Sequence, residues 1–400
     1  MLLFRRLSVI LAAGAFVIAA PTLKQDDIVP GKYIITLKSG MEIEKHLSWA
    51  TQVHTQSPKR RAVDTGVSHQ YSIHDFSGYA GAFDEATIEQ IRSSEDVAFV
   101  EPSSVWGLFQ APNGPDLTTQ SNVPWGLSCI SHKSLPTTDY IYDPRGGTDT
   151  YAYIIDTGLA TNLSEFEGRG VFAYNAVNGS TNNDNVGHGT HVAGTIGSKS
   201  YGVAKAATLI SVKVLDSEFG LDSVVLAGYN WAVQNITAEG REASSVISMS
   251  LGGRYLQAFN DMVEAAYQSG ITTVVAAGNY GELANMTSPA SAPNAITVGA
   301  IASNFSRPAW SDYGSLVDIF APGVNVLSTW ATGNFSQMLS GTSMSAPHVS
   351  GLVLYLKSIM SGLESPSAVA SKIQELATKG VVQSPGDGST NAIAYNGNGA

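Results

Sequence analysis

Cysteine is almost absent from this chain of 400 residues, in which Cys129 is the only one. A single cysteine cannot form a disulfide within the chain, so a small disulfide-stabilised fold is excluded. Charged residues are also scarce, at 14% against 44% hydrophobic residues, which excludes an intrinsically disordered chain. We expect two or three packed regions, with Cys129 a buried small hydrophobic residue. A catalytic thiol at Cys129 is the alternative, although the neighbouring sequence supplies no obvious base.

Positive charge is in deficit, since 22 Lys and Arg stand against 33 Asp and Glu and give a net charge of −11. This balance disfavours nucleic acid and anionic membranes as partners. Long apolar runs are missing after residue 20, so we expect no membrane span. Residues 1–20 carry two arginines, a short apolar run and small residues at its end, which is the pattern of a secretory signal peptide. The sequence therefore predicts a secreted, extracellular protein.

Residues 21–117 are predicted to form a small α+β unit. Strands are expected at 31–37, 71–74, 79–83 and 97–101, with a turn at Gly78, and helices at 42–55 and 85–93, the second capped by Asp84. The order β-α-β-β-α-β predicts a ferredoxin-like sheet.

Two polar segments interrupt this first part of the chain. Lys59-Arg60-Arg61 is interpreted as a solvated loop, with a processing site as the alternative. Residues 102–124 are predicted to form an exposed linker, where chains are readily cut, because they contain Pro102, Pro112, Pro115 and Pro124 with Asn113-Gly114. We place a domain boundary within this linker, near residues 117–119, and end the first unit at residue 117.

Residues 118–400 alternate apolar strands with helices. Strands are expected at 151–156, 208–214, 245–250, 271–276 and 295–299, and helices at 222–238, 258–269 and 349–360. The strands are apolar on both faces, which predicts a doubly wound, mostly parallel α/β sheet covered by helices on both sides. In such a sheet, active residues are expected at the carboxyl ends of the strands.

Three reactive residues stand at the ends of predicted elements, one where a strand ends and two where helices begin. Asp156 ends the first of these strands, His188 stands between two glycines before a run of small residues, and Ser343 lies in Gly-Thr-Ser-Met. A serine hydroxyl needs a base to remove its proton, and the base needs an orienting acid. Pro347 is expected in the first turn of the helix that follows Ser343. Taken alone, Ser343 is equally well interpreted as the N-cap of a core helix.

Nearby residues offer alternatives to each member of this set. Ser345 is a second candidate nucleophile, and Asp184 is a second candidate acid. We interpret residues 182–185 as a surface turn, so Asp156 is the better-placed acid. A metal site would require His-Glu-x-x-His, and the glutamate is missing between His188 and His191. His191 is therefore predicted to be a packed helix residue, and no cofactor is expected in catalysis.

The motifs around these residues resemble those of the subtilisin family of serine proteases (peptidase family S8), and most closely its proteinase K branch. The matching segments are 156–158, 187–195, 250–253, 276–279 and 340–349. The resemblance runs from about residue 123 to residue 396, and residues 27–105 resemble the I9-type inhibitor pro-domain of the family. It implies a secreted serine endopeptidase of the fungal type, made as an inactive zymogen. Its propeptide, residues 21–117, would act as intramolecular inhibitor and folding chaperone until the enzyme cuts itself and releases residues 118–400.

The resemblance also implies roles for individual residues. Ser343 would be the nucleophile, His188 the general base and then acid, Asp156 the orienting acid, and Asn279 a donor to the oxyanion. Contacts to an extended peptide substrate are implied for Gly220, Ser250, Leu251, Gly252, Ala277 and Gly278. The small residues in this set, with Ala276, imply broad specificity for proteins and a preference for large hydrophobic or aromatic P1 residues. The enzyme is expected to act as a monomer.

Two further features are expected outside the catalytic set. The resemblance implies a structural Ca²⁺ held by the Asp318 carboxylate and the carbonyls of Pro293 and Ala295, with an ordinary hydrogen-bonded aspartate as the alternative. Asn-x-Ser/Thr sequons predict glycosylation at one or more of Asn162, Asn178, Asn235, Asn285, Asn304 and Asn334.

Two other functions are compatible with the same scaffold. A binding protein without activity is disfavoured, because all four catalytic groups are present. A processing protease specific for one precursor is disfavoured by the small apolar pocket residues, because pockets for basic residues need acidic walls.

Overall fold

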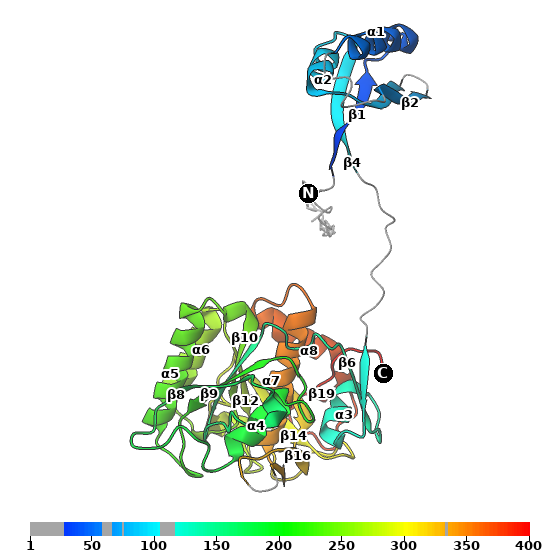
Figure 1. Cartoon of the computed structure of the whole chain (residues 1–400). Helices are drawn as coiled ribbons and strands as arrows, with labels where there is room; N and C mark the ends of the chain where they lie inside the picture. Colours follow the sequence, from blue (N-terminus) through cyan, green and yellow to red (C-terminus); the bar gives the residue numbers. More distant parts are fainter. Residues whose placement is uncertain (1–27, 58–65, 74–75, 105–116, 333–334) are drawn as a thin grey trace, which may run out of the picture. The chain divides into compact units, whose positions relative to one another are not determined.

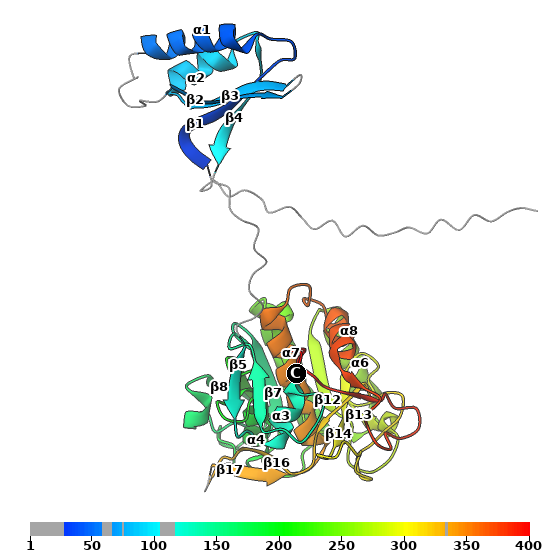
Figure 2. The same cartoon turned by 90° about the vertical axis from the view of Figure 1, so that its right-hand side faces the viewer.

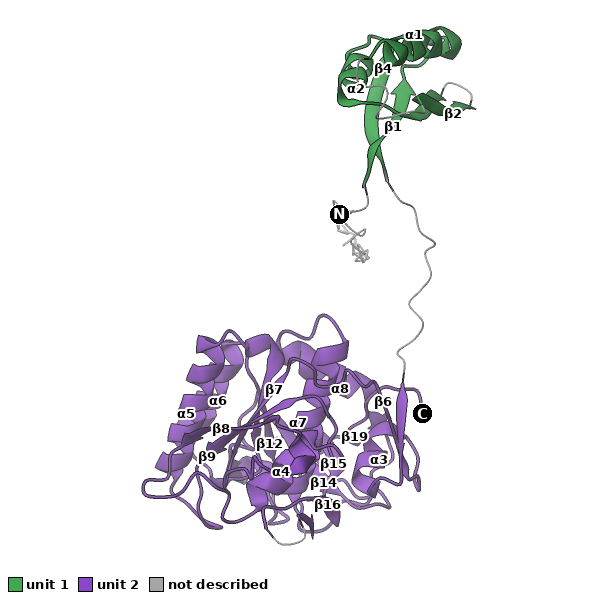
Figure 3. Cartoon of the chain, viewed as in Figure 1, with its two compact units in different colours: residues 1–111 green, residues 112–400 purple. Residues whose placement is uncertain are grey.

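The structure is a computed structural model that describes residues 28–57, 66–73, 76–104, 117–332 and 335–400. The chain forms two compact units, residues 1–111 and 112–400 (Figure 3). The predicted signal peptide, the Lys59-Arg60-Arg61 segment and residues 105–116 of the predicted linker lie outside the described residues. The predicted linker, residues 102–124, is too long, because its first residues belong to strand β4 (Val97–Ser104) and Thr118–Ser121 forms strand β5. Among the residues that are described, no helix has the length and apolar character needed to cross a membrane.

The first unit is an antiparallel sheet with two helices, as predicted (Figure 1). Its elements are β1 (Ile28–Leu37), α1 (Ile43–Gln56), β2 (Gly66–Ile73), β3 (Phe76–Ala82), α2 (Glu85–Arg92) and β4 (Val97–Ser104). The strand order β2-β3-β1-β4 is that of the ferredoxin-like sheet, which confirms the predicted fold. Asp84 caps α2 by accepting two backbone N–H bonds in its first turn, also as predicted.

The predicted turn at Gly78 is wrong. Gly78 lies inside β3, where it pairs with Thr36 on one side and Tyr71 on the other. A β-carbon at this position would lie 2.7 Å from the carbonyl oxygen of Ile35. The glycine therefore permits close strand packing, and does not mark a change of chain direction.

The second unit is built on a nine-stranded sheet with the order β18-β19-β15-β14-β12-β10-β7-β9-β8. All neighbouring pairs from β8 to β19 are parallel, and only β18 is antiparallel to its neighbour. The strands are β7 (Tyr151–Asp156), β8 (Gly170–Asn175), β9 (Thr208–Lys213), β10 (Ser245–Met249), β12 (Thr272–Ala276), β14 (Ile296–Ile301), β15 (Ile319–Pro322), β18 (Thr378–Lys379) and β19 (Ala392–Ile393). The predicted strands correspond to β7, β9, β10, β12 and β14.

Helices cover both faces of this sheet, which confirms the doubly wound α/β fold (Figures 1 and 2). On one face lie α5 (Asp222–Ala238) and α6 (Gln257–Gln268), and on the other lie α4 (His188–Gly197), α7 (Thr342–Ile359) and α8 (Pro366–Leu376). Successive side chains of β7 point to opposite faces of the sheet. Ile154 packs in the core with α4, α7 and α8, and Ile155 packs in the core with α5 and α6. Both faces of the sheet are therefore shielded from water, as expected for strands that are apolar on both sides.

Short elements complete the second unit around the edges of the sheet. They are the helix α3 (Trp125–Ser131) and three strand pairs, β5 (Thr118–Ser121) with β6 (Asp139–Tyr142), β11 (Gly253–Arg254) with β13 (Thr287–Ser288), and β16 (Val326–Thr329) with β17 (Ser336–Leu339). The β17 strand leads directly into the segment that contains Ser343.

Helix α7 begins at Thr342, well before the predicted start at residue 349, so Pro347 lies inside the helix and its predicted place in the first turn is wrong. Proline has no N–H, so it cannot bond the carbonyl of the residue one turn earlier, which is Ser343. The Ser250 hydroxyl donates to that carbonyl at 2.7 Å instead. This bond replaces the missing helix bond and ties the end of β10 to the start of α7.

Helices α4 and α7 contact each other closely and present His188 and Ser343 at their amino ends. The contact depends on Gly351, because a β-carbon there would lie 2.8 Å from Cβ of Val203 and 2.9 Å from the carbonyl oxygen of Ile196. The glycine thus brings the backbones of the two helices together.

We predict that Gly351→Ala lowers the free energy of unfolding by about 1–3 kcal/mol, because overpacking at the α4–α7 contact exceeds the gain in helix propensity. Thermal unfolding measured in a Ser343→Ala background, to prevent autolysis, tests this. Gly253→Ala is the matched control, since a β-carbon there meets nothing within 4 Å. A rise in Tm for Gly351→Ala would contradict the packing argument.

Candidate active site

The side chains of Asp156 and His188 meet at the carboxyl edge of the sheet. Asp156 ends β7 and is 1% exposed, and His188 opens α4. The Nδ1 of His188 donates to Oδ1 of Asp156 at 2.8 Å. Burial lowers the pKa of His188, but the Asp156 carboxylate and this hydrogen bond raise it by more, so the pKa lies above its ordinary value of 6.5. The bond fixes the proton on Nδ1 and leaves Nε2 as a base.

Ser343 is half-buried at the amino end of α7. Its hydroxyl donates to the carbonyl of Ser250 at 2.9 Å, while the Ser250 hydroxyl donates to the Ser343 carbonyl. The structure therefore places the Ser343 hydroxyl on Ser250 and not on His188. In an enzyme without substrate, the hydrogen bond between a catalytic hydroxyl and its base is often long or poorly aligned, and it tightens when substrate binds.

Asn279 is attached to the same helix end through Thr342. The side-chain oxygen of Asn279 accepts from the backbone N–H and the hydroxyl of Thr342, each at 2.9 Å. The Thr342 hydroxyl also accepts from the N–H of Gly278 at 3.2 Å. Because its oxygen is engaged, Asn279 presents its side-chain N–H₂ group as a donor beside the positive end of the α7 dipole.

A cavity of about 180 Å³ opens next to Ser343. It is lined by Leu251, Gly252, Ala276, Gly278, Asn279, Tyr280, Thr287, Ser288, Ala290, Thr342 and Ser343. Of the predicted substrate contacts, Leu251, Gly252 and Gly278 line this cavity.

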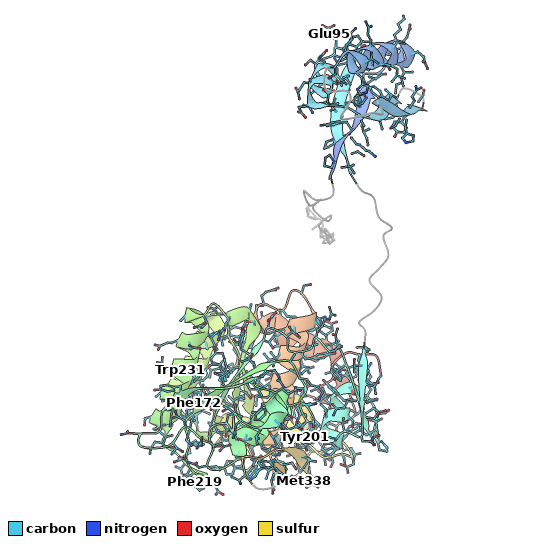
Figure 4. All side chains as sticks on the ribbon, viewed as in Figure 1. Glu95, Phe172, Tyr201, Phe219, Trp231 and Met338 are labelled. Atoms are coloured by element: carbon cyan, nitrogen blue, oxygen red, sulfur yellow. The ribbon has the colours of Figure 1, made fainter. Side chains whose placement is uncertain are left out.

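Three other predicted contacts lie elsewhere. Ser250 is bonded to Ser343, and Ala277 is fully buried in the core on the α5–α6 side of the sheet. Gly220 lies in the exposed loop that precedes α5. Its neighbour Phe219 is 85% exposed, and it projects from the same lower edge of the unit as Met338 of β17 in Figure 4.

Comparison with known proteins places this geometry in a family. Residues 147–393 match the model of the subtilase family, Peptidase_S8, and residues 32–109 match that of the peptidase inhibitor I9. The chain belongs to the subtilase family. It is a subtilisin-like serine endopeptidase preceded by an inhibitor domain, as the motifs predicted.

Similar proteins match along nearly the whole chain. The subtilase is 48% identical over 406 residues to the alkaline proteinase of Hapsidospora chrysogena, with 100% of each chain covered. It is 50% identical over 387 residues to alkaline protease 1 of Aspergillus flavus, with 94% of each covered, and 51% identical over 406 residues to the subtilisin-like proteinase Mp1 of Magnaporthiopsis poae, with 98% of each covered. A solved structure of a cold adapted subtilisin-like serine proteinase shares 40% identity and a TM-score of 0.64, and the match covers 69% of this chain and 99% of that one.

The competing residues of the subtilase are buried in its core. Ser345 is completely buried and donates to the carbonyl of Ala321 at 3.0 Å. His191 is also completely buried, as predicted, and burial lowers its pKa to about 4, so it is neutral. Cys129 is buried, and burial raises its pKa to about 12, which confirms an inert packed residue.

The prediction that Asp184 lies in a surface turn is wrong. The neighbouring Asn182, Asn183 and Asn185 are exposed, but Asp184 is only 4% exposed. Its carboxylate accepts five hydrogen bonds from Thr157 and from the loop and first turn that contain His188. The Asn-rich sequence correctly predicts a turn. Asp184 is the buried residue of this turn, because the turn packs against the end of β7.

Asp312 is a second buried carboxylate that sequence reasoning missed. It lies beneath the turn that carries Asn279, and its Oδ1 accepts from the N–H groups of Tyr280 and Glu282 at 2.8 and 3.0 Å. Its Oδ2 has no partner among the described residues, and a β-carbon on Gly278 would lie 2.1 Å from it. Burial raises the pKa of Asp312. No motif surrounds this residue, so the sequence carries no signal for its role.

The predicted calcium ligands lie at the edge of β14. Oδ2 of Asp318 accepts from the N–H of Thr297 at 2.8 Å, and burial raises the pKa of Asp318 to about 6. Pro293 and Ala295 lie on the segment that enters β14, the strand next to β15. Within the described ranges, no three His, Cys, Asp or Glu side chains form a metal-binding group. A half-buried carboxylate with one N–H bond, bonded next to the segment that enters β14, fits Ca²⁺.

The sequons differ in exposure. Asn162, Asn178, Asn285 and Asn304 are exposed, and Asn334 lies outside the described residues. Asn235 is half-buried in α5, where its side-chain oxygen accepts from the Tyr153 hydroxyl at 2.7 Å. The four exposed asparagines are therefore the better acceptors.

We predict that Asp312→Asn stabilises the subtilase by about 1–2 kcal/mol at pH 8, because it removes a buried charge with an unpaired oxygen and keeps the Oδ1 acceptor. The folded-state pKa of Asp312 is raised, so the gain is largest above that pKa and disappears below about pH 3.8. Thermal unfolding from pH 3 to pH 8 measures this. Asp387→Asn, at an exposed position, is the control, and a loss of stability at pH 8 for Asp312→Asn would refute the argument.

Proposed function

We propose that this subtilase cleaves proteins through a triad of Ser343, His188 and Asp156, with broad specificity and a preference for large hydrophobic or aromatic P1 residues. The observation that carries the proposal is the 2.8 Å bond between His188 and Asp156, with Ser343 at the rim of a cavity beside Asn279. Similarity to proteins called alkaline proteases supports the same reaction class.

In the first step, Nε2 of His188 takes the proton of Ser343 as its Oγ attacks the scissile carbonyl carbon. Asp156 keeps the other ring nitrogen protonated and stabilises the imidazolium that forms. His188 then gives the proton to the leaving amine, the peptide bond breaks and an acyl-enzyme remains. Water, deprotonated by His188, hydrolyses this ester and restores Ser343.

The negative oxygen of each tetrahedral intermediate needs donors that are already in place. The side-chain N–H₂ of Asn279 would supply one, because the Asn279 oxygen is held by Thr342. The backbone N–H of Ser343, at the positive end of α7, would supply another. Both donors belong to one rigid assembly, which lowers the reorganisation needed during reaction.

The substrate chain would lie extended between the Ser250–Gly252 segment and the loop at Gly220. Ala276 and the glycines at 252 and 278 leave part of the cavity wall small, and none of the lining residues is acidic. A bulky apolar P1 side chain therefore fits better than a basic one, which would need an acidic partner. This favours general degradation over the processing of one precursor, and Asn279 and the triad together disfavour a binding protein without activity.

The enzyme is proposed to be made as a zymogen and secreted as a monomeric glycoprotein. Residues 1–20 would direct secretion, and residues 21–117 would inhibit the catalytic domain, residues 118–400, until self-cleavage near residue 117. The match of residues 32–109 to an inhibitor family supports this. The exposed Asn162, Asn178, Asn285 and Asn304 would carry glycans.

We predict that Ser343→Ala remains at full length and loses peptidase activity by at least about 10⁴-fold, because nucleophile and self-processing are lost together. Wild type should lose about 117 residues and cleave an Ala-Ala-Pro-Phe-type peptide. Gel analysis and peptide hydrolysis measure both. Ser345→Ala, which removes a buried hydroxyl on the same helix, is the control and should mature and cleave.

Other results of this experiment have distinct meanings. If Ser343→Ala matures but is inactive, another protease cuts the linker and only the self-processing proposal fails. If mature wild type is inactive on broad peptide pools, the triad proposal fails and a binding function is favoured.

A structural Ca²⁺ is proposed at Asp318, with carbonyls of Pro293 and Ala295, and it would hold this half-buried carboxylate ionised. We predict that EDTA lowers the Tm of Ser343→Ala by several degrees, and that added Ca²⁺ restores it. The double variant Ser343→Ala/Asp318→Asn should show no response to either. A Tm that is unchanged by EDTA in the Asp318-containing protein would exclude the site.

A further inference from the structure

We propose that Asp184 is a positioning residue that aligns His188 with Asp156. The inference rests on the triad proposed above and assigns a role to a residue outside it. Asp184 is buried, and its carboxylate connects the end of β7 to the first turn of α4, the two elements that carry Asp156 and His188.

Each oxygen of Asp184 has its own set of donors. Oδ1 accepts from the Thr157 hydroxyl at 2.9 Å and from the N–H groups of Gly187 and Val186 at 2.8 and 3.1 Å. Oδ2 accepts from the N–H and the hydroxyl of Thr190 at 2.9 and 2.6 Å. The donors lie on both sides of His188, so the carboxylate fixes the backbone that carries the imidazole.

Thr157 completes the connection to the acid of the triad. It directly follows Asp156, its hydroxyl donates to Asp184, and the same hydroxyl oxygen accepts from the N–H of Gly189 at 2.9 Å. A β-carbon on Gly189 would lie 2.2 Å from the carbonyl oxygen of Gly158, so α4 lies directly against the strand end. Two residues on each side of His188 are thus bonded to the Asp184–Thr157 pair.

An ionised carboxylate is the group this position requires. The N-cap residue of α4 is Gly187, which has no side chain to accept the free N–H groups of the helix. Asp184 accepts the Thr190 N–H of the helix and the Gly187 N–H just before it, while the Thr157 hydroxyl accepts the Gly189 N–H. Only a carboxylate offers acceptors at both oxygens. An asparagine would turn an N–H₂ group toward one set of donors and lose those bonds.

Asp184 also acts on His188 through charge. The titratable groups near the imidazole are Asp156 from β7, Asp184 from the preceding loop and the neutral His191 within α4. The buried Lys213 donates to the carbonyls of Thr157 and Asn183, below the same loop, and pairs with Asp216. Removal of the Asp184 charge leaves Asp156 as the one carboxylate, among the residues that the structure describes, that raises the pKa of His188.

The test compares matured wild type, Asp184→Asn and Asp143→Asn in peptide hydrolysis from pH 5 to pH 9. Asp184→Asn should lower kcat at least about 10-fold with KM within about 2-fold, because a small displacement of a catalytic group slows chemistry more than binding. The acid limb of its kcat/KM profile should move to lower pH. Asp143, 1% exposed and bonded to Arg145 before β7, is the matched buried aspartate, and its variant should keep kcat.

If Asp184→Asn does not mature, Thr157→Val and Thr157→Ser replace it. The valine variant removes the hydroxyl that joins Asp184 to Gly189 and should lower kcat, whereas serine should recover most of it. The inference is overturned if Asp184→Asn keeps wild-type kcat and the wild-type acid limb, or if the two Thr157 variants behave alike. Asp156→Asn distinguishes failure of the positioning role from failure of the triad. Full activity of Asp156→Asn overturns the triad itself. If Asp156→Asn is inactive while Asp184→Asn keeps wild-type activity, only the positioning role is overturned.

Discussion

The reciprocal hydrogen bonds between Ser250 and Ser343 are the interaction on which the site depends. Strand β10 and helix α7 are distant in sequence, and these bonds fix the start of the helix at the carboxyl end of the strand. Pro347 makes the arrangement necessary, because it leaves the Ser343 carbonyl without its helical partner. The Ser343 and Asn279 side chains and the cavity wall then meet at one junction of sheet and helix.

Buried carboxylates give this site its rigidity. Asp156, Asp184 and Asp312 are each almost fully buried, and each orients a different part of the site through N–H and O–H donors. Asp156 holds the imidazole, Asp184 holds the helix end, and Asp312 holds the Asn279 turn. A buried charge is costly unless it is well bonded, so these residues stabilise one local geometry rather than the fold in general.

The chain reaches this geometry without a disulfide, since Cys129 is its only cysteine. Two apolar cores, one on each face of the sheet, therefore carry the stability of the second unit. Small residues are essential where elements must approach closely, as Gly351 is at the α4–α7 contact. The close contact of α4 and α7 places their amino ends together at one edge of the sheet. The carboxyl ends of the parallel strands lie at this same edge.

The sequence by itself determined the fold class, most strands and helices of the sheet and the family, and it predicted the reactive residues, because these depend on local periodicity and on short motifs. It predicted β7 and α5 to the residue, whereas β15, a short strand that ends in proline, gave too little local signal. The burial of Asp184, the place of Pro347 inside α7, the strand position of Gly78 and the role of Asp312 were decided only by the tertiary structure. Each depends on a partner far along the chain: Thr157 for Asp184, Ser250 for the carbonyl that Pro347 leaves free, Ile35 for Gly78 and the Asn279 turn for Asp312. Local patterns carry no information about such partners, because only packing brings them into contact.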